Sequence, residues 1–454
     1  MRLVIVGGSD AGISAGLRAR EVDQDVRITV LVADDYPNFS ICGLPYFLSG
    51  EVADWRSLAH RTRQEIAAHG IHLRLNTPAR RLDVARRVVV TDHDELAYDR
   101  LVVATGAEPS RPPIAGIELR GVHVLRSMAD AFAVQTLLLE REPRSALIVG
   151  AGYIGCEMAD AFRLRGLKVT VVEQAGTVLP GFDAEIGRLA QSELERHGVH
   201  VVVDTAVRTI GRGRRGLSVE TSAGTPVQAE LVLVVVGVRP NTALAADAGA
   251  ATGERGALRV SRELGTNLPN VWAAGDCVET WHRQLERPTY LPLGTTAHKQ
   301  GRAAGENAVG GHRQVAGTLG TQVLKVFELA VAGTGLRDHG AREAGFDPLT
   351  MQALIPDHKR YYPGAHALTV RVTGDRRTGR LLGAQIGGHR QGEVAKRIDT
   401  YATALHHGLS VDAMSDLDLS YTPPFAAPWD PVQAAAQVWT ASAGRDRPRI
   451  MEPA

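Results

Sequence analysis

Cysteine is scarce in this 454-residue chain, which contains only three. So few cannot build a disulfide framework, and this favours a reducing, cytoplasmic setting. A surplus of one charge is also lacking, since 51 Lys and Arg residues are balanced by 50 Asp and Glu residues. This balance argues against a nucleic-acid or membrane-surface protein, because both need excess positive charge. The longest apolar run, at residues 231–236, is far too short to span a membrane.

Glycine, by contrast, is plentiful at 48 residues, and it marks a turn near the start of the chain. Residues 1–35 read as strand, glycine turn, helix and strand, which is a βαβ unit. Its first glycine turn (residues 7–12) is made by small residues, namely Gly7, Gly8, Ser9 and Gly12. Such a turn brings backbone N–H groups at a helix N-terminus to a pyrophosphate. Val32 occupies the place of the acid expected after the second strand, and Asp34 or Asp35 is the candidate substitute.

Residues 145–173 repeat this unit with a complete G-x-G-x-x-G pattern. This second glycine turn (residues 150–155) contains Gly150, Gly152, Tyr153, Ile154 and Gly155. The strand predicted at residues 168–172 is followed by Glu173. An acid there can hydrogen-bond both ribose hydroxyls of NAD and repels a 2′-phosphate. We therefore expect NADH at this unit, with NADPH as the second choice.

Three more apolar stretches end in small residues. These ends are Ala104, Thr105 and Gly106, then Gly237, then Gly275 with Asp276. Two dinucleotide folds in one chain suggest two dinucleotides, one held permanently and one visiting. Beyond residue 320 no nucleotide motif occurs. Strands predicted near residues 321–327, 367–372 and 381–386 and a helix at residues 391–407 indicate an α+β domain there.

In this order the motifs closely resemble those of the pyridine nucleotide–disulfide oxidoreductase family, over residues 1 to about 310. The resemblance implies an α/β fold with two Rossmann-like dinucleotide-binding domains, one for FAD and one for NAD(P)H, and a C-terminal α+β dimerisation domain. It also implies that the first glycine turn and Asp276 hold FAD. The domains expected are FAD-binding at residues 1–118 and 246–319, NAD(P)H-binding at 119–245, and dimerisation at 320–454.

Cys42 is the candidate redox residue, because a cysteine at the start of a helix beside a flavin would have a stabilised thiolate. The alternative is an inert core cysteine. Phe47 stands where disulfide reductases of the family carry a second cysteine. The chain thus resembles the single-cysteine subgroup, which includes coenzyme A-disulfide reductases, persulfide reductases and NADH oxidases. Oxidases carry a histidine in the first glycine turn, where this chain has Asp10.

Motifs around Tyr361 and Tyr421 match those of coenzyme A-disulfide reductases. The resemblance implies that both tyrosines are catalytic and come from the partner subunit of a homodimer; interface packing is the alternative. It also implies that Ser40, in the Cys42 motif, binds substrate. Arg18 could meet the phosphates of a coenzyme A-type substrate, or be a solvated surface residue. Trp429 stands where a lysine is common.

We therefore expect an FAD-dependent, NADH-preferring reductase of a small disulfide or persulfide of the coenzyme A type. One alternative is an NADH oxidase that reduces oxygen. Another is an electron-transfer reductase for a ferredoxin- or rubredoxin-like protein, in which Cys42 is a bystander. No His or Cys spacing indicates a metal, so none is expected.

Overall fold

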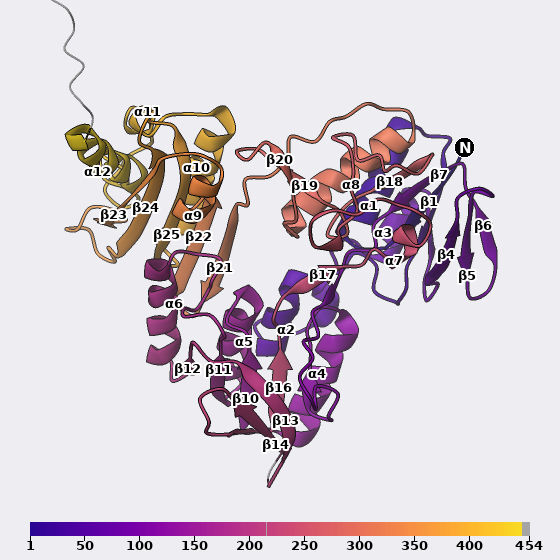
Figure 1. Cartoon of the computed structure of the whole chain (residues 1–454), viewed down its shortest axis with the longest axis horizontal. Helices are drawn as coiled ribbons and strands as arrows, with labels where there is room; N and C mark the ends of the chain where they lie inside the picture. Colours follow the sequence, from indigo (N-terminus) through magenta and orange to yellow (C-terminus); the bar gives the residue numbers. More distant parts are fainter. Residues whose placement is uncertain (215, 447–454) are drawn as a thin grey trace, which may run out of the picture.

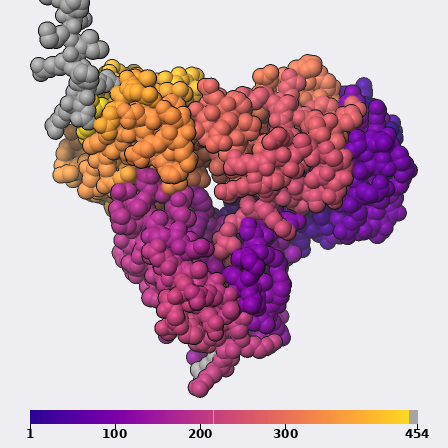
Figure 2. All heavy atoms as spheres, viewed as in Figure 1, coloured from indigo at the N-terminus to yellow at the C-terminus, as the bar shows by residue number. Residues whose placement is uncertain are grey.

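The computed structural model describes residues 1–214 and 216–446, which form three lobes (Figures 1 and 2). The N-terminal lobe and the C-terminal lobe lie at opposite ends of the molecule, and the middle of the chain forms the third. Each lobe is organised around one five-stranded sheet. Among the helices of the described residues, none combines the length and apolar character that a bilayer span requires.

The first lobe contains a parallel sheet in the order β18-β7-β1-β2-β3. Its strands are β1 (Arg2–Val6), β2 (Arg27–Leu31), β3 (Ile71–Arg74), β7 (Arg100–Val103) and β18 (Val271–Ala273). Helices α1 (Asp10–Val22) and α8 (Gly294–Ala308) pack closely, because a Cβ at Gly301 would lie 2.2 Å from the carbonyl oxygen of Ala11. The apolar runs that predicted β1, β2 and β7 are largely buried, and β18 brings the chain back to this sheet after the middle lobe.

The middle lobe repeats the plan with a parallel sheet in the order β12-β11-β10-β16-β9. Its strands are β9 (Val122–His123), β10 (Ser145–Val149), β11 (Lys168–Val172), β12 (His200–Val202) and β16 (Leu231–Val234). Its helices are α4 (Met128–Arg141), α5 (Tyr153–Leu164) and α6 (Ala184–Arg196). The two predicted dinucleotide units are therefore both present.

The C-terminal lobe is an antiparallel sheet, β21-β22-β25-β24-β23, with helices against it. The strands are β21 (Gln322–Val326), β22 (Leu329–Gly335), β23 (Pro348–Pro356), β24 (Ala367–Asp375) and β25 (Leu381–His389). The helices are α9 (Asp338–Glu343), α10 (Val394–His407), α11 (Val411–Ser415) and α12 (Pro431–Asp446). The α/β class with a C-terminal α+β domain is confirmed.

Short elements complete the described fold. The antiparallel strands are β4 (Ala79–Asp83), β5 (Val88–Thr91) and β6 (Glu95–Ala97); β13 (Val207–Gly213), β14 (Gly216–Thr221) and β15 (Val227–Ala229); β8 (Ala107–Pro109) with β17 (Val238–Pro240); and β19 (Thr280–His282) with β20 (Arg287–Thr289). The short helices are η1 (Ile41–Gly43), α2 (Leu44–Ser49), η2 (Trp55–Leu58), α3 (Arg63–Ala68), α7 (Ala243–Ala246) and η3 (Glu254–Gly256).

The three lobes meet where α2 packs against α5, and where β21 contacts α5 and, through Lys325, the Tyr46 ring of α2. The buried carboxylate of Asp160, on α5, joins the lobes. Its Oδ2 lies 2.9 Å from Nζ of Lys325 and accepts the backbone N–H of Phe327 at 3.0 Å. Breaking a buried ion pair leaves an uncompensated charge, which is strongly destabilising. This junction therefore holds the Cys42 segment, just before α2, at a defined place between the lobes.

Candidate active site

The first glycine turn is shaped by close backbone approach. A Cβ at Gly7, where φ is +118°, would lie 2.1 Å from the carbonyl oxygen of Ala104, and one at Gly12 would lie 1.8 Å from that of Gly7. Ser9 is the N-cap of α1 and makes no side-chain cap hydrogen bond. The first N–H groups of α1 therefore lack a capping side chain, and they lie at the positive end of the helix dipole. This arrangement fits a dinucleotide pyrophosphate.

Val32 has a packing role at the end of the first unit. It is 4% exposed, and a Cβ on Gly8 would lie 2.6 Å from its side chain. The exposed Asp34 uses Oδ1 to accept the backbone N–H of Tyr36 at 2.8 Å. The other carboxylate oxygen of Asp34 accepts no hydrogen bond within the described residues. That Asp34 takes the role of the missing acid stays a prediction.

The other predicted flavin residues lie beside this turn. Ala104 follows β7 and lies next to Gly7, and the Thr105 hydroxyl donates to the carbonyl oxygen of Asn241 at 2.5 Å. At Gly106, where φ is +70°, a Cβ would meet no atom within 4 Å. Gly237 has a φ of +104° and the same open space. Small residues thus leave room along the carboxyl ends of the strands, where ligands bind in open parallel sheets.

Asp276 is held by a residue that sequence reasoning missed. Its Oδ2 forms an ion pair with Nη2 of Arg126 at 2.5 Å, and its carbonyl oxygen accepts the Tyr290 hydroxyl at 3.0 Å. Gly275, which precedes it, has a φ of +87° and donates its N–H to Gln300 at 2.9 Å. Arg126 lies in the middle lobe, about 150 residues away in sequence, so no local pattern could have indicated it.

The second glycine turn has the same geometry. A Cβ at Gly150, where φ is +102°, would lie 2.7 Å from the carbonyl oxygen of Val235, and one at Gly155 would lie 2.0 Å from that of Gly150. Gly152 is the N-cap of α5, has no side-chain cap, and would place a Cβ in open space. These features fit a second dinucleotide at this turn.

Glu173 and two residues of the turn line this second site. Glu173 accepts the backbone N–H of Ala151 at 2.6 Å through Oε2 and that of Ala175 at 2.8 Å through Oε1. A carboxylate has about four lone-pair positions, so it retains acceptor capacity for ribose hydroxyls. Tyr153 and Ile154 begin α5, and the buried Tyr153 hydroxyl has no hydrogen-bond partner among the described residues.

Cys42 lies in η1, immediately before α2, and it is exposed, whereas Cys156 and Cys277 are buried. The surrounding atoms raise the pKa of its thiol, first through desolvation and then through the carboxylates of Glu157 and Asp10. The sequence pattern predicts that the helix stabilises the thiolate. The protein's own neighbours act in the opposite direction, because they desolvate the thiol and place two carboxylates near it.

Glu157, on α5, is a second residue that sequence reasoning missed. Burial raises its pKa to about 7, and the Tyr46 hydroxyl donates a hydrogen bond to it. Desolvation and Glu157 in turn raise the pKa of Tyr46. The pair joins α2 to α5 beside Cys42, so a carboxyl group with a pKa near neutrality lies close to the exposed thiol. Perturbed carboxyl groups of this kind are common at functional sites.

The predicted substrate residues are placed differently. Ser40 precedes η1 as its N-cap and makes no side-chain cap bond. Arg18 is engaged in two ion pairs, with Nε 2.8 Å from Glu306 and Nη1 2.8 Å from Glu21. A phosphate would therefore have to compete with two carboxylates for Arg18, and its substrate role stays a prediction.

Tyr361 and Tyr421 lie on the surface of the C-terminal lobe, with 74% and 46% of their surfaces exposed. Within the described chain, neither makes a hydrogen bond or ring contact with Cys42. The same lobe carries further exposed aromatic residues, namely Tyr362, Phe425 and Trp429. Several large exposed aromatic residues on one lobe are consistent with a contact surface for another molecule.

Two parallel sheets, each with a glycine turn at the start of a helix, define a protein built to hold two dinucleotides. Comparison with protein-family models agrees. Residues 1–301 match the pyridine nucleotide-disulphide oxidoreductase model, and residues 321–431 match the dimerisation domain of that family. The chain therefore belongs to the pyridine nucleotide-disulphide oxidoreductases. As in that family, it is an FAD-dependent oxidoreductase that uses NAD(P)H.

Known relatives extend over almost the whole chain. A NAD(P)H coenzyme A polysulfide/persulfide reductase of Pyrococcus horikoshii is 33% identical, over 96% of this chain and 98% of its own. An NADH oxidase of Methanocaldococcus jannaschii is 32% identical, over 96% and 98%. The solved structure of a NAD-dependent persulfide reductase from A. fulgidus is 37% identical with a TM-score of 0.94, covering 98% of this chain and 84% of that one.

Proposed function

We propose that this enzyme reduces a small disulfide or persulfide of the coenzyme A type with NADH, through Cys42. The observation that carries the proposal is the position of Cys42, an exposed and unpaired cysteine at the junction of the two dinucleotide-binding lobes. The reductases of Pyrococcus horikoshii and A. fulgidus support it. The three unpaired cysteines support a reducing, cytoplasmic setting.

The chemistry requires only a single thiol. The Cys42 thiolate attacks one sulfur of the substrate disulfide, releasing one thiolate and leaving a mixed disulfide between Cys42 and the other half. FAD held at the first glycine turn would supply the two electrons, originally from NADH, that cleave this mixed disulfide. Cys42 returns to its thiolate and the second substrate half leaves, so that NADH, a proton and one disulfide yield NAD⁺ and two thiols. Phe47 stands where a second cysteine would be, so the mixed disulfide has to form with the substrate.

Residues around Cys42 supply protons and orientation. A leaving thiolate needs a proton or a hydrogen bond, and we assign this to Tyr361 and Tyr421 of a partner subunit in a homodimer. Their exposure, together with the dimerisation domain, supports this assignment. Ser40 and Arg18 are the proposed substrate contacts. Asp34 and Asp276 are proposed contacts for FAD, and Glu173 for the NADH ribose.

NADH oxidation by oxygen is the second candidate, and the relative from Methanocaldococcus jannaschii favours it. The residue at position 10, Asp10, distinguishes sulfur reduction from oxygen reduction. The carboxylate in the first glycine turn cannot act as the imidazole that oxidases of the family carry there. Sulfur reduction is therefore the preferred activity.

A comparison of electron acceptors tests the proposal. The FAD-loaded enzyme is assayed with NADH and, in turn, coenzyme A disulfide, coenzyme A persulfide, polysulfide and oxygen. We expect a sulfur acceptor to be fastest, and Cys42→Ser to lower its kcat/KM by at least 10³-fold while NADH-dependent reduction of an artificial dye persists. Dye reduction is the internal control, because it needs both dinucleotides and no thiol. Sulfur turnover that survives in Cys42→Ser would refute the proposal, and faster turnover of oxygen would favour an oxidase.

A further inference from the structure

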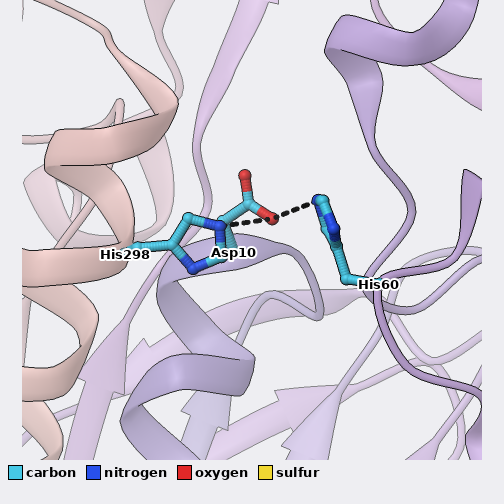
Figure 3. Close-up of side chains that lie close together, drawn as sticks. All are labelled: Asp10, His60 and His298. Carbon is cyan, nitrogen blue, oxygen red and sulfur yellow. Dashed lines mark ion pairs between the residues drawn. The ribbon is translucent and has the colours of Figure 1, made fainter.

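Three side chains from distant segments meet beside the first glycine turn (Figure 3). Asp10 is the first residue of α1, His60 lies in the loop after η2, and His298 is on α8. Both imidazoles point at the same oxygen of Asp10, with Nε2 of His298 at 3.4 Å and Nε2 of His60 at 3.8 Å from Oδ1. The site is therefore two imidazole nitrogens around one carboxylate oxygen.

The distances from the two imidazole nitrogens to Oδ1 of Asp10 fit metal ligation better than hydrogen bonding. Hydrogen bonds between such atoms are usually about 2.7–3.2 Å long. Oδ1 of Asp10 is buried and makes no hydrogen bond within the described residues. Two ligand atoms bound tetrahedrally to zinc, each about 2.0–2.1 Å from the ion, lie about 3.3 Å apart. The three ligand atoms already lie within 4.8 Å of one another, so small side-chain rotations would bring all three within bonding distance of one ion.

A hydrogen bond to Ser14 orients one of the proposed ligands, His298. Nδ1 of His298 lies 3.0 Å from the Ser14 hydroxyl. When Nδ1 donates to Ser14, the lone pair of His298 is on Nε2, which is the nitrogen that points at Asp10. Metal-bound histidines typically donate their other N–H in this way. Ser14 and Asp10 share α1, and the close packing of α1 against α8 fixes both relative to His298.

The third ligand is attached to the same region through the backbone. The N–H of His60 donates to the carbonyl oxygen of Asn38 at 2.9 Å. The rings of His60 and His298 are 5.8 Å apart and nearly perpendicular, at 77°. Their faces therefore do not stack, and their edges converge on Asp10. Asp10, His60 and His298 are far apart in sequence, which explains why no ligand spacing is visible there.

We infer that Asp10, His60 and His298 bind one zinc-class divalent cation, with solvent as the fourth ligand. Two imidazoles and a carboxylate with an open position form a donor set that zinc uses in proteins. Mg²⁺ and Ca²⁺ prefer all-oxygen sites, so they should bind poorly. The inference departs from the sequence expectation of no metal. It does not depend on the identity of the disulfide substrate.

Calorimetric titration with Zn²⁺ tests the site directly. The protein is FAD-loaded Cys42→Ser, so that the exposed thiol cannot itself bind zinc. We expect one Zn²⁺ per chain, no heat with Mg²⁺, and at least a tenfold loss of affinity in each of His60→Ala and His298→Ala. The matched control is His339→Ala, which removes an exposed histidine 3.5 Å from a single carboxylate, that of Glu343. Its affinity should equal that of the parent.

The result that would overturn the inference is Zn²⁺ affinity unchanged in His60→Ala, or no stoichiometric binding in the parent. Flavin content and circular dichroism establish that each variant is folded. His60 lies in an exposed loop, so its variant keeps the test valid even where His298→Ala fails to fold. Binding is measured without turnover, so failure of the zinc site and failure of the proposed reductase activity are distinguishable.

Discussion

The first and second glycine turns share one backbone geometry, but their units end in different residues. In both turns, two glycines are so close to a neighbouring carbonyl oxygen that a Cβ would lie 1.8–2.7 Å from it. The helix after each turn has no capping side chain. The second unit ends in Glu173, whose carboxylate binds the backbone of its own turn. The first ends in Val32, which is buried against Gly8. The geometry of both turns therefore fits a dinucleotide, and we propose that the residue at the strand end sets how its ribose is recognised.

Equivalent glycine substitutions give the largest expected effects and separate the two sites. Gly12→Ala forces a Cβ into the carbonyl oxygen of Gly7, so we expect the purified protein to contain less than about one-tenth of its FAD. Gly155→Ala makes the same clash with Gly150, and should retain FAD while losing reduction by NADH. Absorbance spectra and anaerobic mixing with NADH measure both. The control is Gly152→Ala, whose Cβ enters open space and should leave FAD content unchanged. Loss of FAD in Gly155→Ala would show that the two turns are misassigned.

Coenzyme preference should change by a smaller factor. Glu173→Ala removes the proposed ribose acceptor and the repulsion of a 2′-phosphate, so the ratio of kcat/KM for NADH to that for NADPH should fall about tenfold, equivalent to about 1.4 kcal/mol. Steady-state kinetics with both coenzymes measure this ratio. Asp34→Ala is the counterpart in the first unit and should change FAD retention without changing the ratio. An unchanged ratio in Glu173→Ala would refute the assigned role of that carboxylate.

The contact between the two units should give a pH-dependent effect on stability. Glu157 has a folded-state pKa of about 7, above its ordinary value of 4.5, so its contribution to stability is complete below pH 4.5 and is lost as the pH rises through 7. The loss is about 3 kcal/mol at most. Glu157→Gln cannot lose a proton, so between pH 4.5 and pH 8 its unfolding temperature should fall by a few degrees less than that of wild type. The exposed Glu140→Gln should behave as wild type. Parallel curves for wild type and Glu157→Gln would contradict the raised pKa.

Local patterns in the sequence are sufficient to predict both dinucleotide units. An apolar run, a glycine turn and an amphipathic helix occupy about 30 consecutive residues, so each unit can be predicted from one short segment of the chain. The C-terminal sheet is predicted less well. Its strands β22 and β23 are not expected from the sequence, because Leu329–Gly335 includes two glycines and Pro348–Pro356 begins and ends with proline, which disfavour strands.

The surroundings of the candidate site could be predicted only in part. Cys42 and Asp276 stand in recognisable motifs, but Arg126 and Glu157 reach them from another lobe. Side chains that meet only through tertiary packing leave no spacing in the sequence. The same holds for His60 and His298 beside Asp10. The raised pKa of Cys42 likewise results from burial and from carboxylates that no local pattern could place.

Anaerobic titration of the FAD-loaded enzyme with NADH tests the central claim most directly, because it asks whether Cys42 exchanges electrons with the flavin. A cysteine thiolate against an oxidised flavin gives a long-wavelength charge-transfer absorbance. The enzyme is first treated with coenzyme A disulfide, so that Cys42 starts as a mixed disulfide that can take up two electrons. We predict that two electrons from NADH then release the Cys42 thiolate beside oxidised flavin, so that the band develops in wild type and is absent in Cys42→Ser. Reduction of wild type without the band, or the same band in Cys42→Ser, would contradict the role of Cys42.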